Sequence, residues 1–318
     1  MAEHTTFKVF RYNPETDSKP YFQSYQVPLQ GGKTVLDGLN EIKGQQDGTL
    51  TYRMSCRSAI CGSCGMVVNG HSKLVCRLQI AEVLKNFDEV VIEPMRNFEV
   101  IRDLVVNMDR FWDKMDKVTP WLVADEENVP ATERLQSPAD FNVIRDASSC
   151  IMCGVCLSDC TSLEVDSNFL GPAALAKAFR MAADSRSVDR EERLLELSKE
   201  GGVWDCARCY ECVQVCPKYV APMETIMKLR EMTLKADLVD NRGTRHVEHF
   251  TELVLDSGIL DERRLPMKTV GLTDLKGMLH MAPTGLRMML KGKMPLIHPH
   301  IKDVDELQRI AHKVEESK

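Results

Sequence analysis

Two stretches of eleven residues decide the fold of this chain: CIMCGVCLSDC at residues 150–160 and CARCYECVQVC at residues 206–216. Each stretch has four cysteines in the spacing C-x2-C-x2-C-x3-C. Four further cysteines precede them, so that all twelve fall into three groups of four and none is left over. Cysteines gathered in this way indicate that the members of each group act together. The groups are Cys56, Cys61, Cys64 and Cys76; Cys150, Cys153, Cys156 and Cys160; and Cys206, Cys209, Cys212 and Cys216.

The composition narrows the kinds of partner and ligand. With 318 residues, 43% of them apolar, the chain is long enough for two domains and an appendage. A formal net charge of -6 argues against nucleic-acid binding, which draws most of its affinity from a basic surface. The start, MAEHTTFKVFRY, does not resemble a secretion signal, and no run of about 18 apolar residues predicts a membrane span. We therefore expect a reducing compartment, where clustered cysteines bind metal rather than form disulfides.

The first cysteine group has the spacing C-x4-C-x2-C, with a fourth cysteine after an Asn69-Gly70 turn. This spacing is typical of a plant-ferredoxin-type [2Fe-2S] site. Small residues between the cysteines let a loop wrap tightly and point backbone N–H groups at sulfur, which stabilises a negative cluster. A structural zinc site is the alternative, but such sites usually pair two C-x2-C knuckles, and four residues separate Cys56 from Cys61.

The other two groups have the spacing of a bacterial ferredoxin with two cubane clusters. In that arrangement, three cysteines of a motif bind one cluster and the fourth cysteine reaches the other. One [4Fe-4S] cluster is therefore predicted on Cys150, Cys153, Cys156 and Cys216. The third cluster of the chain is predicted on Cys160, Cys206, Cys209 and Cys212.

Alternation of apolar and polar residues predicts the N-terminal secondary structure. Two alternating runs within residues 7–28 predict a β-hairpin, and a helix is expected near TVLDGLNEIKG. Strands are expected around GMVVNG and EVVIEP. These elements predict a small α+β domain over residues 1–105, a plant-type [2Fe-2S] ferredoxin of the β-grasp kind. One face of a following helix is expected at Ile101, Leu104, Val105, Met108, Phe111 and Met115.

The rest of the chain is predicted to be helical. The acidic, proline-containing residues 120–140 predict a surface loop. Helices are expected at GPAALAKAFRMAAD, DREERLLELSKEGG and PMETIMKLREMTLKA. With the two cubane motifs, they predict an all-α domain over residues 106–240 that resembles a bacterial two-cluster ferredoxin.

Residues 241–318 form a C-terminal extension. Its stretch KGMLHMAPTGLRMMLKGKMPLIHPHIK is basic and methionine-rich, and DVDELQRIAHKVEE predicts a final helix. Three roles are open for the basic stretch: docking on a partner, lying at a membrane surface, or packing along the chain's own domains. His298 and His300 are expected to be surface or capping residues rather than ligands. Helix interruptions are expected at Pro283, Gly285, Gly292 and Pro295.

No motif indicates a second kind of chemistry. The sequence has no G-x-G-x-x-G after a strand, no P-loop and no recognisable nucleophile motif. We therefore expect neither a flavin nor a nicotinamide on this chain and assign no catalytic residue. Three clusters in a row predict a chain of one-electron carriers between two partners.

Three motifs in a fixed order, CRSAICGSCG, CIMCGVC and VCPK, carry a resemblance to a known family. Over residues 5–240 the chain resembles the iron-sulfur subunit of succinate dehydrogenase and fumarate reductase. The resemblance implies a flavoprotein subunit with covalently bound FAD, near the [2Fe-2S] domain, where succinate and fumarate interconvert. It also implies electron flow from [2Fe-2S] through [4Fe-4S] to the third cluster, and a peripheral location on the cytoplasmic face of the cell membrane.

Two features depart from the pattern of that family. Most members lack the second cysteine of the third motif and hold a [3Fe-4S] cluster, whereas this chain has Cys209. A fourth thiolate favours [4Fe-4S]; the alternative is a free thiol beside [3Fe-4S]. The family usually has proline after its counterpart of Cys160 and histidine after its counterpart of Cys206, close to the bound quinone. Here Thr161 and Ala207 occupy these places, so the usual quinone site is absent or rebuilt.

These departures and the long extension resemble divergent complexes whose anchor subunit is similar to heterodisulfide reductase, with CCG motifs, in place of cytochrome b helices. The run LKGKMPLIHPHIKDVDELQRI is similar to segments of such proteins. We favour the electron-transfer subunit of a succinate:quinone oxidoreductase or fumarate reductase of this type, which reaches quinone only indirectly. The alternatives are the same role beside another flavoprotein, such as a thiol-dependent fumarate reductase, and a free-standing ferredoxin-like carrier.

Overall fold

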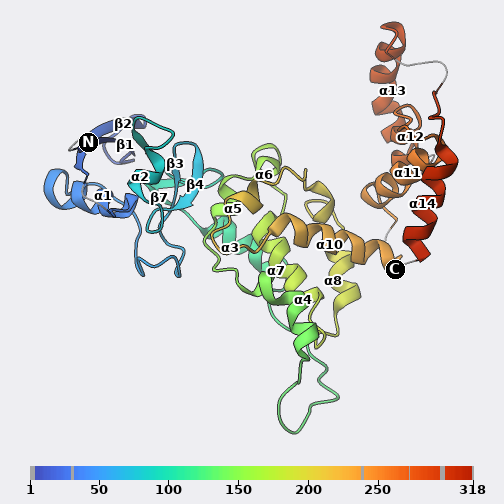
Figure 1. Cartoon of the computed structure of the whole chain (residues 1–318), viewed down its shortest axis with the longest axis horizontal. Helices are drawn as coiled ribbons and strands as arrows, with labels where there is room; N and C mark the ends of the chain where they lie inside the picture. Colours follow the sequence, from blue (N-terminus) through green and yellow to red (C-terminus); the bar gives the residue numbers. More distant parts are fainter. Residues whose placement is uncertain (1–3, 30–31, 238–239, 272, 294–297, 317–318) are drawn as a thin grey trace. The chain divides into compact units, whose positions relative to one another are not determined.

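The computed structural model describes residues 4–29, 32–237, 240–271, 273–293 and 298–316. It divides into two compact units, unit 1 up to Thr233 and unit 2 from Leu234 onward. Unit 1 contains all the labelled strands and the helices as far as α10 except the last two residues of α10, and unit 2 contains helices α11 to α14 (Figure 1). All twelve cysteines lie in unit 1.

Unit 1 begins with a mixed sheet of five strands: β1 His4–Arg11, β2 Tyr21–Pro28, β3 Gly65–Val68, β4 His71–Leu74 and β5 Val90–Glu93. Their order is β2-β1-β5-β3-β4. The pairing of β1 with β2 confirms the predicted hairpin, and β5 lies parallel to β1. Asn69 and Gly70, both with positive φ, form the predicted turn between β3 and β4.

The predicted N-terminal helix is α1, Val35–Glu41. The Thr34 hydroxyl accepts a hydrogen bond from the N–H of Asp37, and the Asp37 carboxylate accepts one from the N–H of Thr34, so both ends of a capping box are made. Gly38 lies against the ring of Phe7, where a Cβ would come within 2.5 Å of the ring. Glycine at this position therefore lets the helix pack closely on the sheet.

The helix predicted from the apolar spacing of residues 101–115 is wrong in its first half. Ile101 lies in β6, Val100–Arg102, and Val105 begins β7, Val105–Val106; the two strands pair antiparallel. The helix is limited to α3, Asp109–Asp116, which buries the predicted Phe111 and Met115.

The turn between β6 and β7 explains the difference. Asp103 there is 2% exposed and has a φ of 47°, which a right-handed helix does not contain. Its carboxylate accepts hydrogen bonds from Nε of Arg11 (3.1 Å) and from the N–H groups of Tyr12 (3.0 Å) and Thr51 (2.9 Å). This buried acceptor fixes the turn to the sheet, and the β-branched residues around it favour strands.

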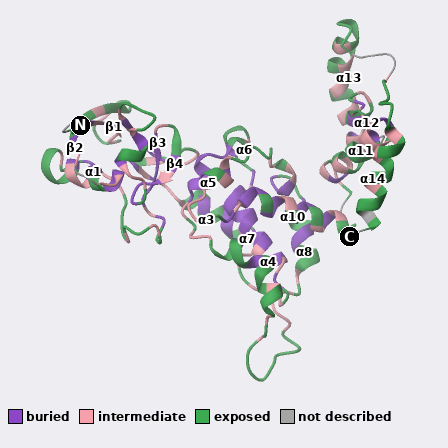
Figure 2. Cartoon of the chain, viewed as in Figure 1, coloured by how far each residue is buried: buried purple, intermediate pink, exposed green. Residues whose placement is uncertain are grey.

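The second half of unit 1 is helical. The predicted loop has neither helix nor strand from residue 120 until α4 begins at Pro138. In α7, nine of eleven residues are buried, which makes it the central helix of this half (Figure 2). Its many alanines allow α4 and α8 to pack closely on it.

The longer helices of unit 1 are α4 Pro138–Ser148, α7 Pro172–Ala182, α8 Arg190–Leu197 and α10 Pro222–Lys235. The short helices are α2 Ile80–Val83, α5 Val155–Ser158, α6 Thr161–Val165 and α9 Glu211–Gln214. Single turns are formed by η1 Ile42–Gln46 and η2 Val203–Asp205.

Unit 2 consists of α11 Arg242–Ser257, α12 Arg264–Val270, α13 Leu275–Leu290 and α14 Val304–Glu316. The final helix is as predicted. The expected interruptions at Pro283 and Gly285 are wrong, because α13 runs through both. Proline removes one N–H donor, and the leucines, methionines and alanine around it are helix formers that keep the remaining turns helical. Gly292 follows the helix as expected, whereas Pro295 lies outside the described residues.

Within the described ranges, no helix combines the length and apolar character needed to cross a membrane.

Candidate functional site

Three cysteines of the first group, Cys56, Cys61 and Cys64, lie in an irregular loop between η1 and β3, and the fourth, Cys76, follows β4. Arg57, Ala59 and Gly62 have positive φ values of 56°, 54° and 75°. These residues turn the chain repeatedly within a few positions and bring its N–H groups to one side. Cys56 and Cys61 lie toward the solvent, whereas Cys64 and Cys76 are buried against the sheet.

The N–H groups of this loop point at sulfur, as we predicted from the small residues between the cysteines. Sγ of Cys56 accepts hydrogen bonds from the N–H groups of Ser58 (3.4 Å), Ile60 (3.3 Å) and Cys61 (3.2 Å). The hydroxyl of Ser63 lies 3.0 Å from Sγ of Cys61. This hydrogen bond and nearby backbone N–H groups lower the pKa of Cys61 to about 6. A loop whose dipoles stabilise thiolates fits an anionic [2Fe-2S] group.

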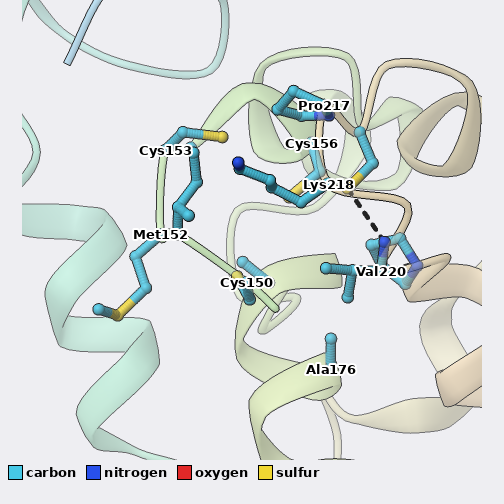
Figure 3. Close-up of a pocket in the computed structure, with 13 residues that line it drawn as sticks. Cys150, Met152, Cys153, Cys156, Ala176, Pro217, Lys218 and Val220 are labelled. Atoms are coloured by element: carbon cyan, nitrogen blue, oxygen red, sulfur yellow. Dashed lines mark hydrogen bonds between the residues drawn. The ribbon is translucent and has the colours of Figure 1, made fainter. Parts of the chain in front are cut away.

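The second set draws on both cubane motifs. Cys150, Cys153, Cys156 and Cys216 line one cavity, although Cys216 is 60 residues from Cys156 in the sequence. Figure 3 shows this cavity, with the hydrogen bond from the N–H of Val220 to Sγ of Cys216 (3.4 Å) as a dashed line. The cavity is narrow, ≈ 20 Å³, so the fit to a cluster depends on the four converging thiols rather than on the volume.

Apolar surroundings distinguish this set from the solvent-facing Cys56 and Cys61 of the first set, although burial also raises the pKa of Cys64 there to about 12. Burial raises the pKa of Cys153 to about 11 and raises the pKa of Cys156 well above its usual value. Ala173 and Ala176 of α7 form part of the wall, and Lys218 supplies a cation at its edge. A bound cluster would therefore replace, by metal coordination, the charge stabilisation that the surroundings withhold from free thiolates.

The third set is also brought together. Burial is the main cause that raises the pKa of Cys160 to about 11, and the charges of Cys209 and Cys206 add to it. Burial likewise raises the pKa of Cys212 to about 12, with contributions from Cys206, Cys160 and Cys209. Each of these two thiols thus lies within electrostatic reach of the other members of the set. Cys209 itself is exposed.

The two cubane motifs share an unusual backbone. Met152 and Gly154 have positive φ on either side of Cys153, and Arg208 and Tyr210 have positive φ on either side of Cys209. A methionine, an arginine and a tyrosine rarely take this conformation, so its repetition indicates a common local structure. Cys209 therefore has the same backbone setting as Cys153, in agreement with the spacing that the two motifs share.

The two segments that depart from the family pattern lie next to each other. The N–H of Ala207 donates to the hydroxyl of Ser162 (3.2 Å), which follows Thr161. Arg230 of α10 holds the same loop by donating to the carbonyls of Cys206 (2.9 Å) and Trp204 (3.1 Å). The altered residues thus form one connected surface beside the third set of cysteines.

Close contact joins the first two sites. A Cβ at Gly62 would lie 2.6 Å from Cβ and 2.9 Å from Cα of Cys153, so the two loops touch through this glycine. Cys61 and Cys153 also line one cavity of ≈ 360 Å³ between the loops. No atom larger than hydrogen fits on Gly62 without moving the loops apart.

Buried hydrogen bonds hold the sheet to the helical half. The carboxylate of Asp159 accepts from the N–H of Ser72 (3.0 Å) and from its hydroxyl (2.5 Å). The hydroxyl of Ser158 accepts from the N–H of Arg96 (2.9 Å), and the amide of Asn97 donates to the carbonyl of Leu157 (2.9 Å). The sequence analysis did not identify these residues, because nothing in a single sequence links Asp159 to a serine 87 positions earlier.

The histidines of the extension have no metal-like setting. Nε2 of His298 lies 2.9 Å from the hydroxyl of Ser257 and 3.0 Å from the carbonyl of Ile259, at the C-terminal end of α11, which agrees with the predicted capping role. His300 is exposed. Within the described part of the chain, no three His, Cys, Asp or Glu side chains are close enough to bind a single metal ion. The thiolates that bind an iron-sulfur cluster lie further apart than those that bind a single metal ion.

Family models match both halves of unit 1. The model described as a 2Fe-2S iron-sulfur cluster binding domain matches residues 6–113, and the one described as a 4Fe-4S dicluster domain matches residues 146–220. A solved structure, the Mycobacterium smegmatis Sdh1 complex in the apo form, has a chain with a TM-score of 0.66 and 23% identity, covering 75% of this chain and 99% of that one. This likeness supports the fold.

Curated relatives are more similar in sequence. A fumarate reductase iron-sulfur subunit of Mycobacterium tuberculosis is 44% identical over 231 residues, 72% of this chain and 93% of that protein. A succinate dehydrogenase iron-sulfur subunit of Coxiella burnetii is 37% identical over 233 residues, 72% of this chain and 97% of that protein. An 8-methylmenaquinol:fumarate reductase iron-sulfur subunit of Wolinella succinogenes is 37% identical over 285 residues, 87% of each chain. An alignment that covers 87% of this chain is longer than unit 1, so the match to the Wolinella succinogenes protein includes part of unit 2.

Proposed function

The chain belongs to the family of fumarate reductase and succinate dehydrogenase iron-sulfur subunits, and from this premise we propose which residues carry its electrons and which partners it connects. It is an electron-transfer subunit with one [2Fe-2S] and two further clusters. We propose that an FAD-containing flavoprotein subunit exchanges electrons with the [2Fe-2S] end, and that a membrane-anchor subunit exchanges them with the third cluster.

One observation supports this assignment most strongly. Cys150, Cys153, Cys156 and Cys216, which come from both later motifs, line one cavity, and Gly62 of the first loop touches Cys153 there. When bound, the clusters each accept and release one electron at a time. The strand order β2-β1-β5-β3-β4 with α1 against it supports the plant-type β-grasp assignment for residues 1–105. The proposed further division is a cubane domain at 106–240 and an extension at 241–318.

The residues of the chain have distinct roles in this proposal. Cys56, Cys61, Cys64 and Cys76 would hold [2Fe-2S], and Cys150, Cys153, Cys156 and Cys216 would hold the middle [4Fe-4S]. Backbone N–H groups stabilise the first site. The apolar wall from α7 excludes water from the second site.

We assign Cys160, Cys206, Cys209 and Cys212 to the third cluster and favour [4Fe-4S] there over [3Fe-4S]. The support is the backbone around Cys209, which repeats that around Cys153, and the interaction of Cys209 with Cys160 and Cys212. Because the family's usual proline and histidine are not present beside this site, we propose that the anchor subunit is similar to heterodisulfide reductase, with CCG motifs. This chain would then reach quinone only indirectly, through that subunit. The complex would be peripheral to the cytoplasmic face of the membrane.

The test uses the anaerobically purified, oxidised protein beside its Cys209→Ser variant. With Cys209 as a ligand, low-temperature EPR of the wild type lacks the isotropic three-iron signal, the protein contains about ten irons, and the variant gains the signal. A full-strength three-iron signal in both proteins would show that Cys209 is a bystander. The purified complex should also reduce a dye with succinate, or oxidise one with fumarate; if it does neither, the assignment to this family's reaction fails.

A further inference from the structure

Helix α13, Leu275–Leu290, leaves large apolar side chains uncovered. Of its residues, none is buried (Figure 2). Leu286 is 59% exposed and Leu290 is 81% exposed. The exposed large apolar residues of this helix are Leu275, Leu279, Leu286, Met289 and Leu290.

The exposed residues share one face of the helix. At 3.6 residues per turn, residues 275, 279, 282, 286, 289 and 290 lie within a single stripe along α13. Gly277, Met281 and Met288, on the opposite side, are partly covered. The apolar stripe is therefore the uncovered face, not the one that packs on the rest of unit 2.

A row of basic residues borders the stripe. Lys276, His280, Arg287 and Lys291 follow one another along the same edge and are all exposed. The helix contains no aspartate or glutamate. Within the described part of the chain, no salt bridge neutralises Lys276, Arg287 or Lys291. Because the whole chain has a net charge of -6, this edge is a local positive region on an acidic protein.

We propose that α13 is a docking surface for an anionic lipid bilayer, with its apolar stripe in the outer acyl region and its basic edge at the headgroups. The stripe is aliphatic and thioether throughout, without the hydrogen-bonding groups that usually give a protein interface its specificity, and its border has one sign of charge. The 16 residues of α13 rise about 24 Å, short of a hydrocarbon core of about 30 Å, so the helix lies along the surface.

Through α13 the chain itself would contact lipid, in addition to the contact made by a membrane-anchor subunit. The contact through α13 is independent of the electron-transfer role, because vesicle binding is measured without turnover. A chain that binds vesicles but fails in the succinate and fumarate assays would keep this proposal and lose the functional one.

The experiment is co-sedimentation of the full, anaerobically purified chain with vesicles. One set is phosphatidylcholine alone, and the other is an equimolar mixture of phosphatidylcholine and phosphatidylglycerol. Binding is expected to be more than tenfold stronger to the mixed vesicles and to weaken as salt is raised. Equal binding to both sets, or no binding to the mixed set, would overturn the proposal; in the latter case a protein surface covers the stripe.

Two matched substitutions locate the contact. Leu286→Glu places a charge in the stripe, whereas Ile310→Glu places one on α14 at a residue with nearly the same exposure, 57% against 59%. Leu286→Glu should abolish sedimentation with mixed vesicles and Ile310→Glu should leave it unchanged. Similar losses in both variants contradict a docking surface on α13. Circular dichroism of each variant verifies that unit 2 is folded.

The basic edge is tested separately with Arg287→Gln and with the double variant Lys276→Gln/Arg287→Gln. Each lost cation near an anionic surface should weaken binding to mixed vesicles by about fivefold. Binding to pure phosphatidylcholine should not change. If the double variant binds mixed vesicles as tightly as the wild type, the headgroup contact is wrong.

Discussion

Cys56 and Cys61 of the first cysteine loop lie toward the solvent, whereas the cysteine stretch at residues 150–156 lies against α7 and the segment that follows Cys216. In the first loop, N–H and hydroxyl groups from the loop itself point at sulfur and lower the pKa of Cys61 to about 6. In the second, burial raises the pKa of Cys153 to about 11. The first loop thus stabilises negative charge with its own backbone, and the second depends on walls and a fourth cysteine from distant parts of the chain.

The largest expected effect comes from removing one cysteine from each site. Cys156→Ser should lose the middle cluster, so that the iron content falls from about ten to about six, and should unfold part of the helical half, because a bound cluster joins segments 60 residues apart. Cys61→Ser should keep its fold, since its loop is local. Iron analysis and circular dichroism of both variants measure these outcomes. If the two variants lose helical structure equally, the distinction between a local and a distributed site fails.

A smaller effect is expected from removing a hydrogen-bond acceptor that holds the sheet to the helical half. Asp159→Ala leaves the buried N–H of Ser72 without its acceptor and should lower the free energy of unfolding by about 3 kcal/mol. Asp159→Asn keeps an acceptor oxygen and should cost less. Anaerobic denaturant titration, followed by circular dichroism, gives both values. If Asp159→Ala unfolds at the same denaturant concentration as the wild type, other contacts hold the sheet to the helical half.

The same contrast explains how much of the molecule could be predicted. The spacing of the cysteines and the small residues around them identified the first loop, including its N–H groups aimed at Cys56, because that geometry is local. The crossed set around Cys216 was predicted by analogy with a repeated spacing, and the structure gathers these four cysteines at one cavity. Asp103 and Asp159 were missed because their partners are far away in the sequence, and Asp103 also broke the predicted helix.

The contact between the loops offers a more selective test. Gly62→Ala and Gly154→Ala impose the same conformational strain of about 1–2 kcal/mol, because both glycines have nearly equal φ values, 75° and 76°. A Cβ on Gly62 meets the backbone of Cys153. One on Gly154 meets side-chain ends, those of Met108 and Phe98 at 3.2 Å and that of Met95 at 3.6 Å. Only Gly62→Ala should move the sites apart.

The separation is read from EPR rather than from turnover. In the fully reduced protein, a paramagnetic cluster close to the [2Fe-2S] site is expected to speed the relaxation of the [2Fe-2S] signal. Gly62→Ala should weaken that enhancement, and Gly154→Ala should leave it as in the wild type. Unchanged relaxation in Gly62→Ala would show that the loops rearrange without separating, and equal changes in both would attribute the effect to backbone strain.

The smallest expected effect concerns the hydroxyl groups of the exposed loop. The Ser63 hydroxyl lies 3.0 Å from Sγ of Cys61, whereas the Ser58 hydroxyl donates to the carbonyl of Cys56 at 3.1 Å. A hydrogen bond to a thiolate stabilises the more negative, reduced state, so Ser63→Ala should lower the reduction potential of the [2Fe-2S] site by about 40 mV, the equivalent of about 1 kcal/mol for one electron. Ser58→Ala removes a hydroxyl from the same loop but none from sulfur, and its potential should match the wild type. An EPR-monitored redox titration measures both; equal shifts would mean that loop polarity in general, and not the bond to Cys61, sets the potential.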